Sequence, residues 1–394
     1  MVSSTTFLVT VSGPDRVGVG AELFAALTSL ETRGIAITDV AQITIRGALV
    51  LCAEVSSRNA VSREVVEAAL AQRNIVSEGI TATVEEVTPS ELSDGRRLLV
   101  TFLAPRIGAT QLEGVFAAIA GSGSTCERIV HLASYPVDCY ELVVHGSDHA
   151  ALREALVDVA AVSGLDLAVQ RAGLHRRAKH LVVMDADSTL LQDEVIDLLA
   201  EECGCAAEVS AITELAMSGE IDFAEALRRR VALLEGLPAS VLDDVRSRLR
   251  LTPGARTLLR TLQRLGYVPA VVSGGFGEVL APLMAELKVE YLAANHLEII
   301  DEKLTGRLVG EMVDRAGKAN AMRRFAAEVG VPLEQTVAVG DGANDIDMLS
   351  AAGLGIAFNA KPVVQEHADT QLTVPYLDAV LYFLGISREE IETL

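Results

Sequence analysis

The second half of the chain begins with Leu181-Val-Val-Met-Asp-Ala-Asp-Ser-Thr189, which indicates its fold class. An apolar run followed at once by polar residues is typical of a buried strand of a parallel sheet that ends in a turn. Open α/β sheets bind their ligands at the carboxyl ends of such strands. Asp185 and Asp187 could divide the work there, because one carboxylate can bind a hard cation and act as a nucleophile while the other moves a proton. A plain strand-ending turn would fit the same residues, so this interpretation needs support from elsewhere in the chain.

Two further apolar runs end in polar turns of the same kind. Val268–Val272 leads into Ser273-Gly-Gly275, where a hydroxyl and unhindered backbone N–H groups could cradle phosphate oxygens. Thr336–Val339 leads into Gly340-Asp-Gly-Ala-Asn-Asp345, which offers carboxylates and an amide to a metal and its waters. Between them, Lys318 opens a helical pattern. These elements in this order predict one site at the edge of an α/β sheet.

The order D-x-D-x-T, S-G-G, lysine and G-D-G-x-N-D resembles the haloacid-dehalogenase superfamily of phosphatases over about residues 181 to 385. The resemblance implies a Rossmann-like parallel sheet with a helical cap inserted after the first strand. It implies that Asp185 is the nucleophile and that Asp187 is the general acid and base. It further implies that Ser273, Gly274 and Lys318 hold the phosphoryl group.

The same resemblance implies a Mg²⁺ site. The ligands would be the carboxylates of Asp185 and Asp341 and the backbone carbonyl of Asp187. The residues expected to complete the surroundings of the phosphate and the metal are Thr189, Asn344 and Asp345.

The position of the insertion indicates where a cap would lie. Ser273 follows Asp185 by 88 residues, which is enough for a helical cap at about residues 195–255. Within this insertion, four residues match the substrate-contacting positions of phosphoserine phosphatases: Glu194, Met217, Phe223 and Arg230.

Phosphoserine fits these residues chemically. It carries an ammonium and a carboxylate besides its phosphate, so its site needs one anion and one planar cation beyond the phosphoryl pocket. Glu194 and Arg230 would supply them, and Met217 and Phe223 would exclude water. The same residues could instead be a helix cap, a member of a solvated arginine face, and ordinary apolar core.

The sequence therefore predicts hydrolysis of phosphoserine to serine and phosphate through an aspartyl-phosphate, the last step of serine biosynthesis. Three alternatives remain open. One is another small-molecule phosphatase, and one is a phosphotransferase that passes the phosphoryl group to an acceptor such as homoserine. The third is an amino-acid-binding regulator with a vestigial phosphatase.

The first half of the chain contains a repeat. Leu8–Val11 leads into a turn that ends at Gly18, and Leu99–Phe102 leads into a turn that ends at Gly108, about ninety residues later. Each copy continues with a helical pattern, two β-rich segments, a second helical pattern and a short strand, which predicts a β-α-β-β-α-β unit.

That order, with a glycine opening the first helix, resembles the ACT domain, a ferredoxin-like module that senses amino acids. The resemblance implies a homodimer and an effector, for which serine is the candidate, near Asp15, Gly18 and Gly108. The second copy lacks a counterpart of Asp15, and modules that serve only for dimerisation are the alternative. The expected domains are residues 1–88, 97–172 and 180–394.

Composition excludes several classes of partner. The chain has 394 residues and a formal charge of -21, which repels nucleic acids and anionic lipid surfaces. No apolar run approaches the length of a membrane span, and the first residues do not read as a signal peptide, so we expect a cytoplasmic protein. Cys203 and Cys205 are expected to be reduced structural thiols, and no histidine is assigned to catalysis.

Overall fold

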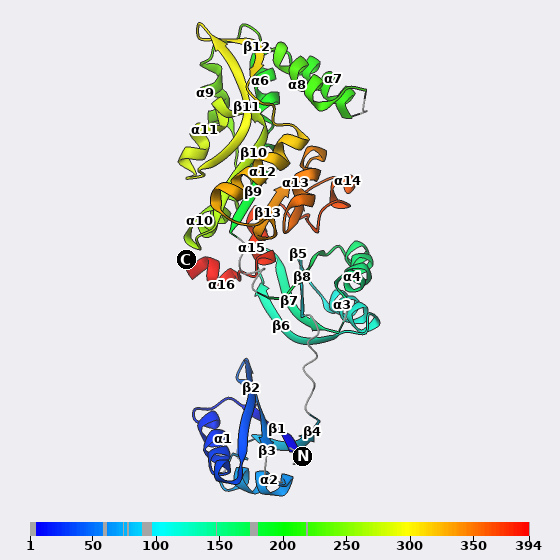
Figure 1. Cartoon of the computed structure of the whole chain (residues 1–394), viewed down its shortest axis with the longest axis vertical. Helices are drawn as coiled ribbons and strands as arrows, with labels where there is room; N and C mark the ends of the chain where they lie inside the picture. Colours follow the sequence, from blue (N-terminus) through cyan, green and yellow to red (C-terminus); the bar gives the residue numbers. More distant parts are fainter. Residues whose placement is uncertain are drawn as a thin grey trace. The chain divides into compact units, whose positions relative to one another are not determined.

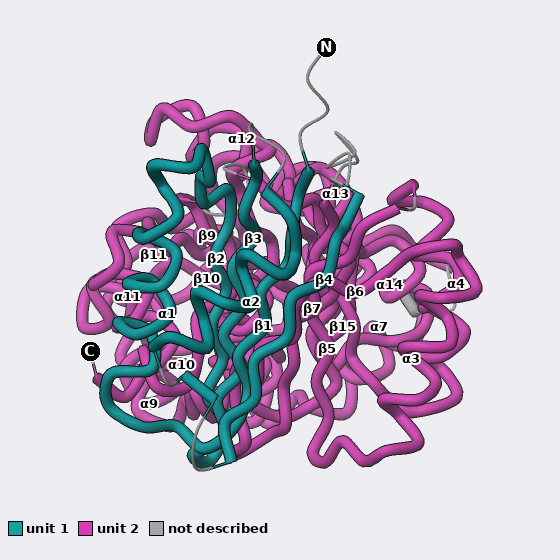
Figure 2. Tube along the Cα trace, turned by 90° about the horizontal axis from the view of Figure 1, so that it is seen from below, with its two compact units in different colours: residues 1–94 teal, residues 95–394 magenta. Residues whose placement is uncertain are grey.

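The computed structural model of the protein describes residues 5–57, 61–73, 75–76, 79–88, 97–146, 148–173, 180–217 and 220–393. The chain forms two compact units, Met1–Asp94 and Gly95–Leu394, which Figure 2 colours teal and magenta.

The first unit has the ferredoxin-like order expected of the first repeat. Its antiparallel sheet has the strand order β2-β3-β1-β4. Phe7, Val9 and Val11 alternate along β1 and point into the core, where they meet Leu23 and Val66 of the two helices. The elements are β1 (Thr5–Pro14), α1 (Val19–Thr28), β2 (Ile35–Ile45), β3 (Ala48–Ser57), α2 (Arg63–Ala71) and β4 (Thr81–Val87).

The second repeat has the same topology and lies in the second unit. Its sheet order is β6-β7-β5-β8, which is equivalent strand by strand to that of the first repeat. The predicted β-α-β-β-α-β order is therefore confirmed in both copies. The elements are β5 (Leu98–Ala104), α3 (Ala109–Gly121), β6 (Thr125–Ala133), β7 (Asp138–His145), α4 (His149–Ser163) and β8 (Asp166–Arg171).

The rest of the second unit is built on a seven-stranded sheet in the order β12-β11-β10-β9-β13-β14-β15. All neighbouring strands are parallel except β11 and β12, which are antiparallel. The predicted α/β sheet is therefore confirmed. The strands are β9 (Leu181–Asp185), β10 (Val268–Phe276), β11 (Tyr291–Ile300), β12 (Lys303–Val309), β13 (Thr336–Gly340), β14 (Gly355–Phe358) and β15 (Thr370–Leu372).

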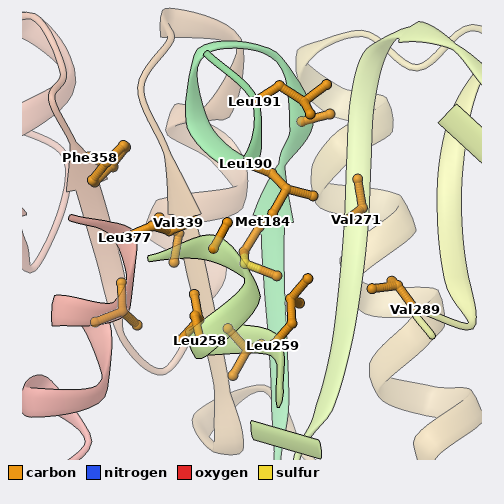
Figure 3. Close-up of a cluster of buried hydrophobic side chains, with 14 of the residues drawn as sticks. Met184, Leu190, Leu191, Leu258, Leu259, Val271, Val289, Val339, Phe358 and Leu377 are labelled. Atoms are coloured by element: carbon orange, nitrogen blue, oxygen red, sulfur yellow. The ribbon is translucent and has the colours of Figure 1, made fainter. Parts of the chain in front are cut away.

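The apolar run on β9 serves both faces of this sheet. Leu181 and Val183 enter the cluster on one face, and Val182 and Met184 enter the cluster on the other. Figure 3 shows Met184 between Val271 of β10 and Val339 of β13. Burial on both faces explains why β9 is apolar at every position before Asp185.

Helices surround the sheet (Figure 1), and a group of them is inserted between β9 and β10. The inserted helices are α6 (Val195–Cys203), α7 (Ala206–Met217), α8 (Phe223–Ala232) and α9 (Val241–Arg248). The remaining ones are α10 (Ala255–Arg264), α11 (Gly277–Glu286), α12 (Arg315–Val329), α13 (Ile346–Ala351), α14 (Pro362–Gln365), α15 (Val380–Phe383) and α16 (Arg388–Thr393). None of the described helices is long and apolar enough to cross a membrane.

The two connections of this inserted cap run side by side. Leu191 and Leu251 form an antiparallel bridge. On either side of it, the N–H of Gln192 donates to the carbonyl of Arg250, and the N–H of Thr252 donates to the carbonyl of Leu190, both at 2.9 Å. The cap is therefore joined to the sheet domain through a short two-stranded ribbon.

The second repeat packs directly on the sheet domain. Cys139 and Ala168 of the repeat belong to the same buried cluster as Leu381 and Phe383 near the end of the chain. At the rim of this contact, the buried carboxylate of Asp166 accepts hydrogen bonds from the N–H and the hydroxyl of Thr373, at 2.7 and 3.0 Å. The repeat and the sheet domain thus share a core.

One sequence expectation about cysteines is wrong. Cys203 and Cys205, expected to be reduced, are joined by a disulfide at the end of α6. A left-handed Gly204 between them turns the chain back so that the two side chains meet. Cys52, Cys126 and Cys139 are not in disulfides.

The environment of Asp166 predicts that the stability of the folded protein depends on pH. Burial raises the pKa of Asp166 to about 6, although its hydrogen bonds from Thr373 oppose this. In an unfolded chain the pKa of such a carboxyl is about 4. The stability that its protonation contributes is therefore fully present below about pH 4 and is lost as the pH rises through about 6.

Asp166→Asn should remove this loss. As the pH rises from about 4.5 to about 7, the melting temperature of the variant should increase relative to that of the wild type. Each kcal/mol by which the two free energies of unfolding differ corresponds to about 2–4 °C. Melting curves followed by circular dichroism measure it, with the exposed Asp158→Asn as control. A difference that stays constant with pH would contradict the raised pKa.

Candidate active site

The polar turns that follow β9, β10 and β13 lie side by side, because these three strands are neighbours in the sheet. Asp185 ends β9, Ser273 lies within β10, and Asp341 directly follows β13. Lys318 joins them from α12. This helix begins at Arg315, so Lys318 lies in its first turn and does not open the helix as the sequence pattern indicated.

Lys318 is fully buried between two carboxylates. Its Nζ lies 2.7 Å from Oδ2 of Asp185 and 2.7 Å from Oδ1 of Asp345. Burial lowers the pKa of the Lys318 ammonium, but the two carboxylates outweigh burial and hold that pKa above its usual range. The site therefore contains a permanent positive charge beside the Asp185 carboxylate.

Asp185 presents one oxygen to this lysine and the other to its own turn. Its Oδ1 accepts a hydrogen bond of 2.7 Å from the N–H of Ala186. Burial, and then the charge of Asp345, raise the pKa of Asp185, while Lys318 opposes them. A cation among the neighbouring carboxylates would act in the same direction as Lys318 and favour the ionised, nucleophilic form.

Asp187 is poised to exchange a proton near neutral pH. Its Oδ1 accepts from the N–H of Val195 at 3.0 Å, and its Oδ2 accepts from Oγ of Ser273 at 3.2 Å. Burial, and then the charge of Glu194, raise the pKa of Asp187 to about 7. A carboxyl with such a pKa can serve as an acid in one step and as a base in the next.

The loop Ser273–Gly275 requires its glycines. A Cβ on Gly275 would lie 2.8 Å from Oδ2 of Asp187 and 3.0 Å from Oγ of Ser273. A Cβ on Gly274 would lie 3.1 Å from Cζ of Phe223, which comes from α8 of the cap. The backbone of this loop therefore runs directly between the Asp187 carboxyl and the cap.

The acidic cluster of the site suits a hard cation. Oxygens of Asp185, Asp341 and Asp345 lie within 4.8 Å of one another. The hydroxyl of Thr189 donates to Oδ1 of Asp341 at 2.9 Å and orients that carboxylate. Burial, and then the charge of Asp345, raise the pKa of Asp341 to about 6. A cluster of carboxylate oxygens of this kind is a ligand set that Mg²⁺ and similar cations prefer.

Asp345 is already engaged within this cluster. Its Oδ1 faces Lys318, and its Oδ2 accepts a hydrogen bond of 2.9 Å from the N–H of Gly342. These contacts hold the Asp345 carboxylate between Lys318 and the turn that follows β13. Asn344 folds its side chain back over Gly342 in the same turn, close to where a Cβ would stand.

The residues predicted to contact substrate from the cap have different surroundings in the structure. Glu194 precedes α6 but makes no side-chain cap; it accepts a hydrogen bond of 2.7 Å from Oγ of Ser188. Phe223 lies against Gly274, as described above. Met217 ends α7, and its side chain lies outside the described residues.

Arg230 is not part of a solvated arginine face. Its Nε is buried and has no hydrogen-bond partner in the part of the chain that the structure describes. Burial lowers the pKa of Arg230, while the charges of Glu194 and Asp197 oppose this. Arg229, by contrast, is exposed and pairs with Glu225. A buried donor without a partner is the feature expected of a residue that awaits an anion.

The structure also adds residues that sequence reasoning missed. The hydroxyl of Thr252 donates to the carbonyl of Thr189 at 2.7 Å and so ties the hinge of the cap to the D-x-D-x-T turn. Asn295 of β11 donates to the carbonyl of Gly274 at 2.9 Å. An asparagine directly after Leu292-Ala-Ala294 was the signal available for the latter.

The candidate effector residues of the two repeats are not equivalent. Gly18 precedes α1 with a φ of 99°, and a Cβ there would meet nothing within 4 Å. Gly108 precedes α3 in an extended conformation, and its N–H donates to Oε1 of Gln111 at 2.9 Å. Asp15 is exposed, and its N–H donates to the carbonyl of Gly47 at 2.8 Å. The first repeat therefore has the more open turn.

Comparisons with known proteins agree with this layout. Residues 182–350 match the family model described as haloacid dehalogenase-like hydrolase, and residues 5–77 and 98–170 match two ACT domain models. A phosphoserine phosphatase from Streptomyces coelicolor is 52% identical over 98% of this chain and 94% of its own length. The chain belongs to the phosphoserine phosphatase family.

A relative from Mycobacterium tuberculosis, also named phosphoserine phosphatase, is 47% identical over 100% of this chain and 96% of its own length. Among solved structures, a HAD family hydrolase from Salmonella enterica serovar Typhi matches with a TM-score of 0.66 and 28% identity, covering 74% of this chain and 99% of that one. A phospho-aspartyl intermediate analogue of phosphoserine phosphatase matches with a TM-score of 0.50 and 42% identity, covering 52% of this chain and 98% of that one.

The close approach of Gly275 to Asp187 yields a prediction. Gly275→Ala should lower phosphate-ester hydrolysis by roughly 10- to 100-fold, because the new methyl group must displace the Asp187 carboxyl or the Ser273 hydroxyl. The assay is phosphate release from an aryl phosphate, with Gly121→Ala as control, since a Cβ on Gly121 meets nothing within 4 Å. Full activity in a folded Gly275→Ala variant would show that these contacts are not needed.

Proposed function

We propose that this protein hydrolyses O-phospho-L-serine to serine and phosphate, with Mg²⁺ as its cofactor, through an aspartyl-phosphate on Asp185. The observation that carries the proposal is the buried Lys318 at 2.7 Å from Asp185, together with Asp187 hydrogen-bonded to Ser273 and a buried Arg230 Nε that has no hydrogen-bond partner among the described residues. The full-length likeness to phosphoserine phosphatases supports the same substrate.

In the first step, an oxygen of Asp185 forms a bond to phosphorus while the bond from phosphorus to the serine oxygen breaks. Asp187 gives its proton to the departing serine oxygen, which matches its pKa of about 7. In the second step, Asp187 takes a proton from water as that water attacks phosphorus and releases Asp185. Lys318, Ser273 and Gly274 would hold the phosphoryl oxygens throughout.

The proposed metal site uses the carboxylates of Asp185 and Asp341 with the backbone carbonyl of Asp187. When bound, Mg²⁺ would offset the negative charge of the phosphoryl group and of the carboxylates around it. Thr189, Asn344 and Asp345 would support the surroundings, Thr189 through its hydrogen bond to Asp341.

The proposed substrate pocket is completed by the cap. Arg230 would take the carboxylate of phosphoserine, because a planar guanidinium matches a carboxylate and its Nε has no other partner in the described residues. Glu194 would take the ammonium group. Phe223 would shield the phosphoryl loop from water, and Met217 is proposed as the second apolar wall.

The test is a set of phosphorylated compounds assayed with Mg²⁺: phosphoserine, phosphothreonine, phosphoethanolamine and phosphoserine peptides. Free phosphoserine should be preferred, and Asp185→Asn should abolish turnover. Phosphate transfer to added homoserine without release would favour the phosphotransferase. Complete inactivity of the folded wild type on every compound would favour the vestigial regulator.

Asp187→Asn should slow the hydrolysis of phosphoserine by on the order of 10²- to 10⁴-fold in the phosphoryl-transfer step. Hydrolysis of p-nitrophenyl phosphate should lose much less in that step, because its leaving group needs little protonation. Rapid-quench kinetics with both substrates measure the difference. Equal losses would mean that Asp187 acts through structure or metal binding and not as the acid.

Arg230→Ala should raise the KM for phosphoserine by roughly 10- to 100-fold, the expected loss for a hydrogen bond to a charged group. The KM for phosphoethanolamine, which lacks the carboxylate, should change little. Steady-state kinetics with both compounds measure this, and Arg229→Ala, an exposed neighbour paired with Glu225, is the matched control. An undiminished preference for phosphoserine in Arg230→Ala would remove Arg230 from the substrate site.

We also propose that the two repeats bind an amino acid, with serine as the candidate, and join two copies of the chain. The exposed side chains of Ile37, Val40, Ile43 and Ile45 on β2 support the dimer, because β2 is an edge strand of its sheet and presents unpaired backbone groups. The open turn at Gly18 supports the first repeat as the effector site. A cytoplasmic location remains a prediction from the sequence.

If serine acts at the first repeat, Gly18→Gln should relieve inhibition by serine while catalysis is kept. Linkage requires that bound serine and bound substrate weaken each other by the same factor. Inhibition kinetics measure the effect, with Gly164→Ala as a control glycine that also has a positive φ and open space around it. Strictly competitive and unchanged inhibition in Gly18→Gln and Gly108→Gln would leave the repeats as dimerisation modules.

A further inference from the structure

The phosphoryl-binding loop interrupts the pairing of β10 with β11. Val272 pairs with Ala293 and Phe276 pairs with Asn295, so three residues of β10 stand opposite one residue of β11. Ser273, Gly274 and Gly275 therefore leave the ladder, and their backbone groups need other partners.

The side chain of Asn295 supplies one of those partners. Its Nδ2 donates to the carbonyl of Gly274 at 2.9 Å, and its Oδ1 accepts from the N–H of Val313 at 2.8 Å. The side chain is 2% exposed, so both hydrogen bonds are shielded from water. A carbonyl and an N–H as partners leave no ambiguity about which end of the amide is which.

The first hydrogen bond determines where the next N–H points. The peptide unit between Gly274 and Gly275 is planar and trans, so its N–H points away from its carbonyl. With the carbonyl directed toward Asn295, the N–H of Gly275 is directed toward Oγ of Ser273, to which it donates at 2.8 Å. That hydroxyl in turn donates to Oδ2 of Asp187 at 3.2 Å.

The second hydrogen bond reaches the helix that carries the lysine. Val313 directly precedes Asp314, whose side chain caps α12 by accepting from the N–H of Gly317 at 2.8 Å. Lys318 follows in the same first turn, and its N–H donates to the carbonyl of Asp314 at 2.8 Å. One amide therefore connects the phosphoryl loop with the base of the lysine helix.

We propose that Asn295 is a positioning residue of the reaction, which orients the peptide between Gly274 and Gly275 and keeps it in register with Lys318. It acts through the loop and does not touch the phosphoryl group. The inference rests on the proposed function, since it assumes that this loop holds phosphate.

Two variants separate positioning from folding. Asn295→Asp keeps an acceptor for the N–H of Val313 but replaces the donor to Gly274 by an oxygen. Asn295→Ser leaves room for water to reach both groups and introduces no buried charge. Asn320→Asp makes the same chemical change at an exposed position on α12 and is the matched control.

The measurements are kcat and KM for phosphoserine and p-nitrophenyl phosphate, and the inhibition constant of inorganic phosphate. Both Asn295 variants should keep the circular dichroism spectrum of the wild type. For both substrates, kcat should fall by roughly 10- to 100-fold, and inorganic phosphate should bind more weakly, with Asn295→Asp affected more than Asn295→Ser. Asn320→Asp should match the wild type in every value.

Two outcomes would overturn the proposal. Folded variants that keep kcat and the affinity for inorganic phosphate within about twofold of the wild type would show that the loop holds its geometry without Asn295. Loss of folding in both variants would assign Asn295 to the core alone. Wild-type activity on phosphoserine tests the proposed function separately, because the inference on Asn295 depends only on ratios between variants and wild type.

Discussion

The structure of the site depends on one buried ammonium group. Lys318 has no exposed surface, and the cost of removing its charge from water is offset only because carboxylate oxygens of Asp185 and Asp345 lie 2.7 Å away on two sides. Those carboxylates come from the ends of β9 and β13, so the ion pairs hold two neighbouring strand ends against α12. The close approach of Asp345 to Gly340, where a Cβ would lie 2.5 Å from its carboxyl carbon, leaves no room for another arrangement. The ion pairs of Lys318 thus require β9 and β13 to be neighbours in the sheet, and they also balance the charges of the site.

The residues of the candidate site come from two parts of the second unit. The carboxylates, Lys318 and the Ser273–Gly275 loop lie on the sheet domain, in which β9 packs on both faces. Glu194, Phe223 and Arg230 stand on the inserted cap, which is tied to the sheet domain by a short ribbon at Leu191 and Leu251. The hydroxyl of Thr252 on this ribbon donates to the carbonyl of Thr189, so the ribbon is joined directly to the D-x-D-x-T turn.

The second repeat takes part in the core of the phosphatase. Its strand β8 lies against β15, and Asp166 joins the two through Thr373. Any ligand that shifts β8 would therefore act on an edge of the catalytic sheet through packed side chains. This contact would give a ligand bound to the second repeat a physical route to the phosphatase sheet within one compact unit.

Much of this protein could be predicted from its sequence, because the information is local. Apolar runs that end in Asp185, Ser273 and Asp341 indicated both the parallel sheet and the edge at which the site forms. The repeat of strand, turn and helix indicated two ferredoxin-like modules, and the order of four motifs indicated the family. The roles of individual site residues remain predictions that the geometry of the site makes testable.

Only the tertiary structure decided which side chains lose water and which meet across the chain. Arg230 and Arg229 are adjacent in sequence, yet Nε of Arg230 is buried without a partner in the described residues while Arg229 pairs with Glu225. Asn295 is one polar residue of β11, next to His296, until the bulge in β10 brings the carbonyl of Gly274 within 2.9 Å. The shared core of the second repeat and the disulfide of Cys203 with Cys205 were likewise not foreseen. Burial and long-range pairing depend on how separate elements pack, and a pattern read along one segment does not contain that information.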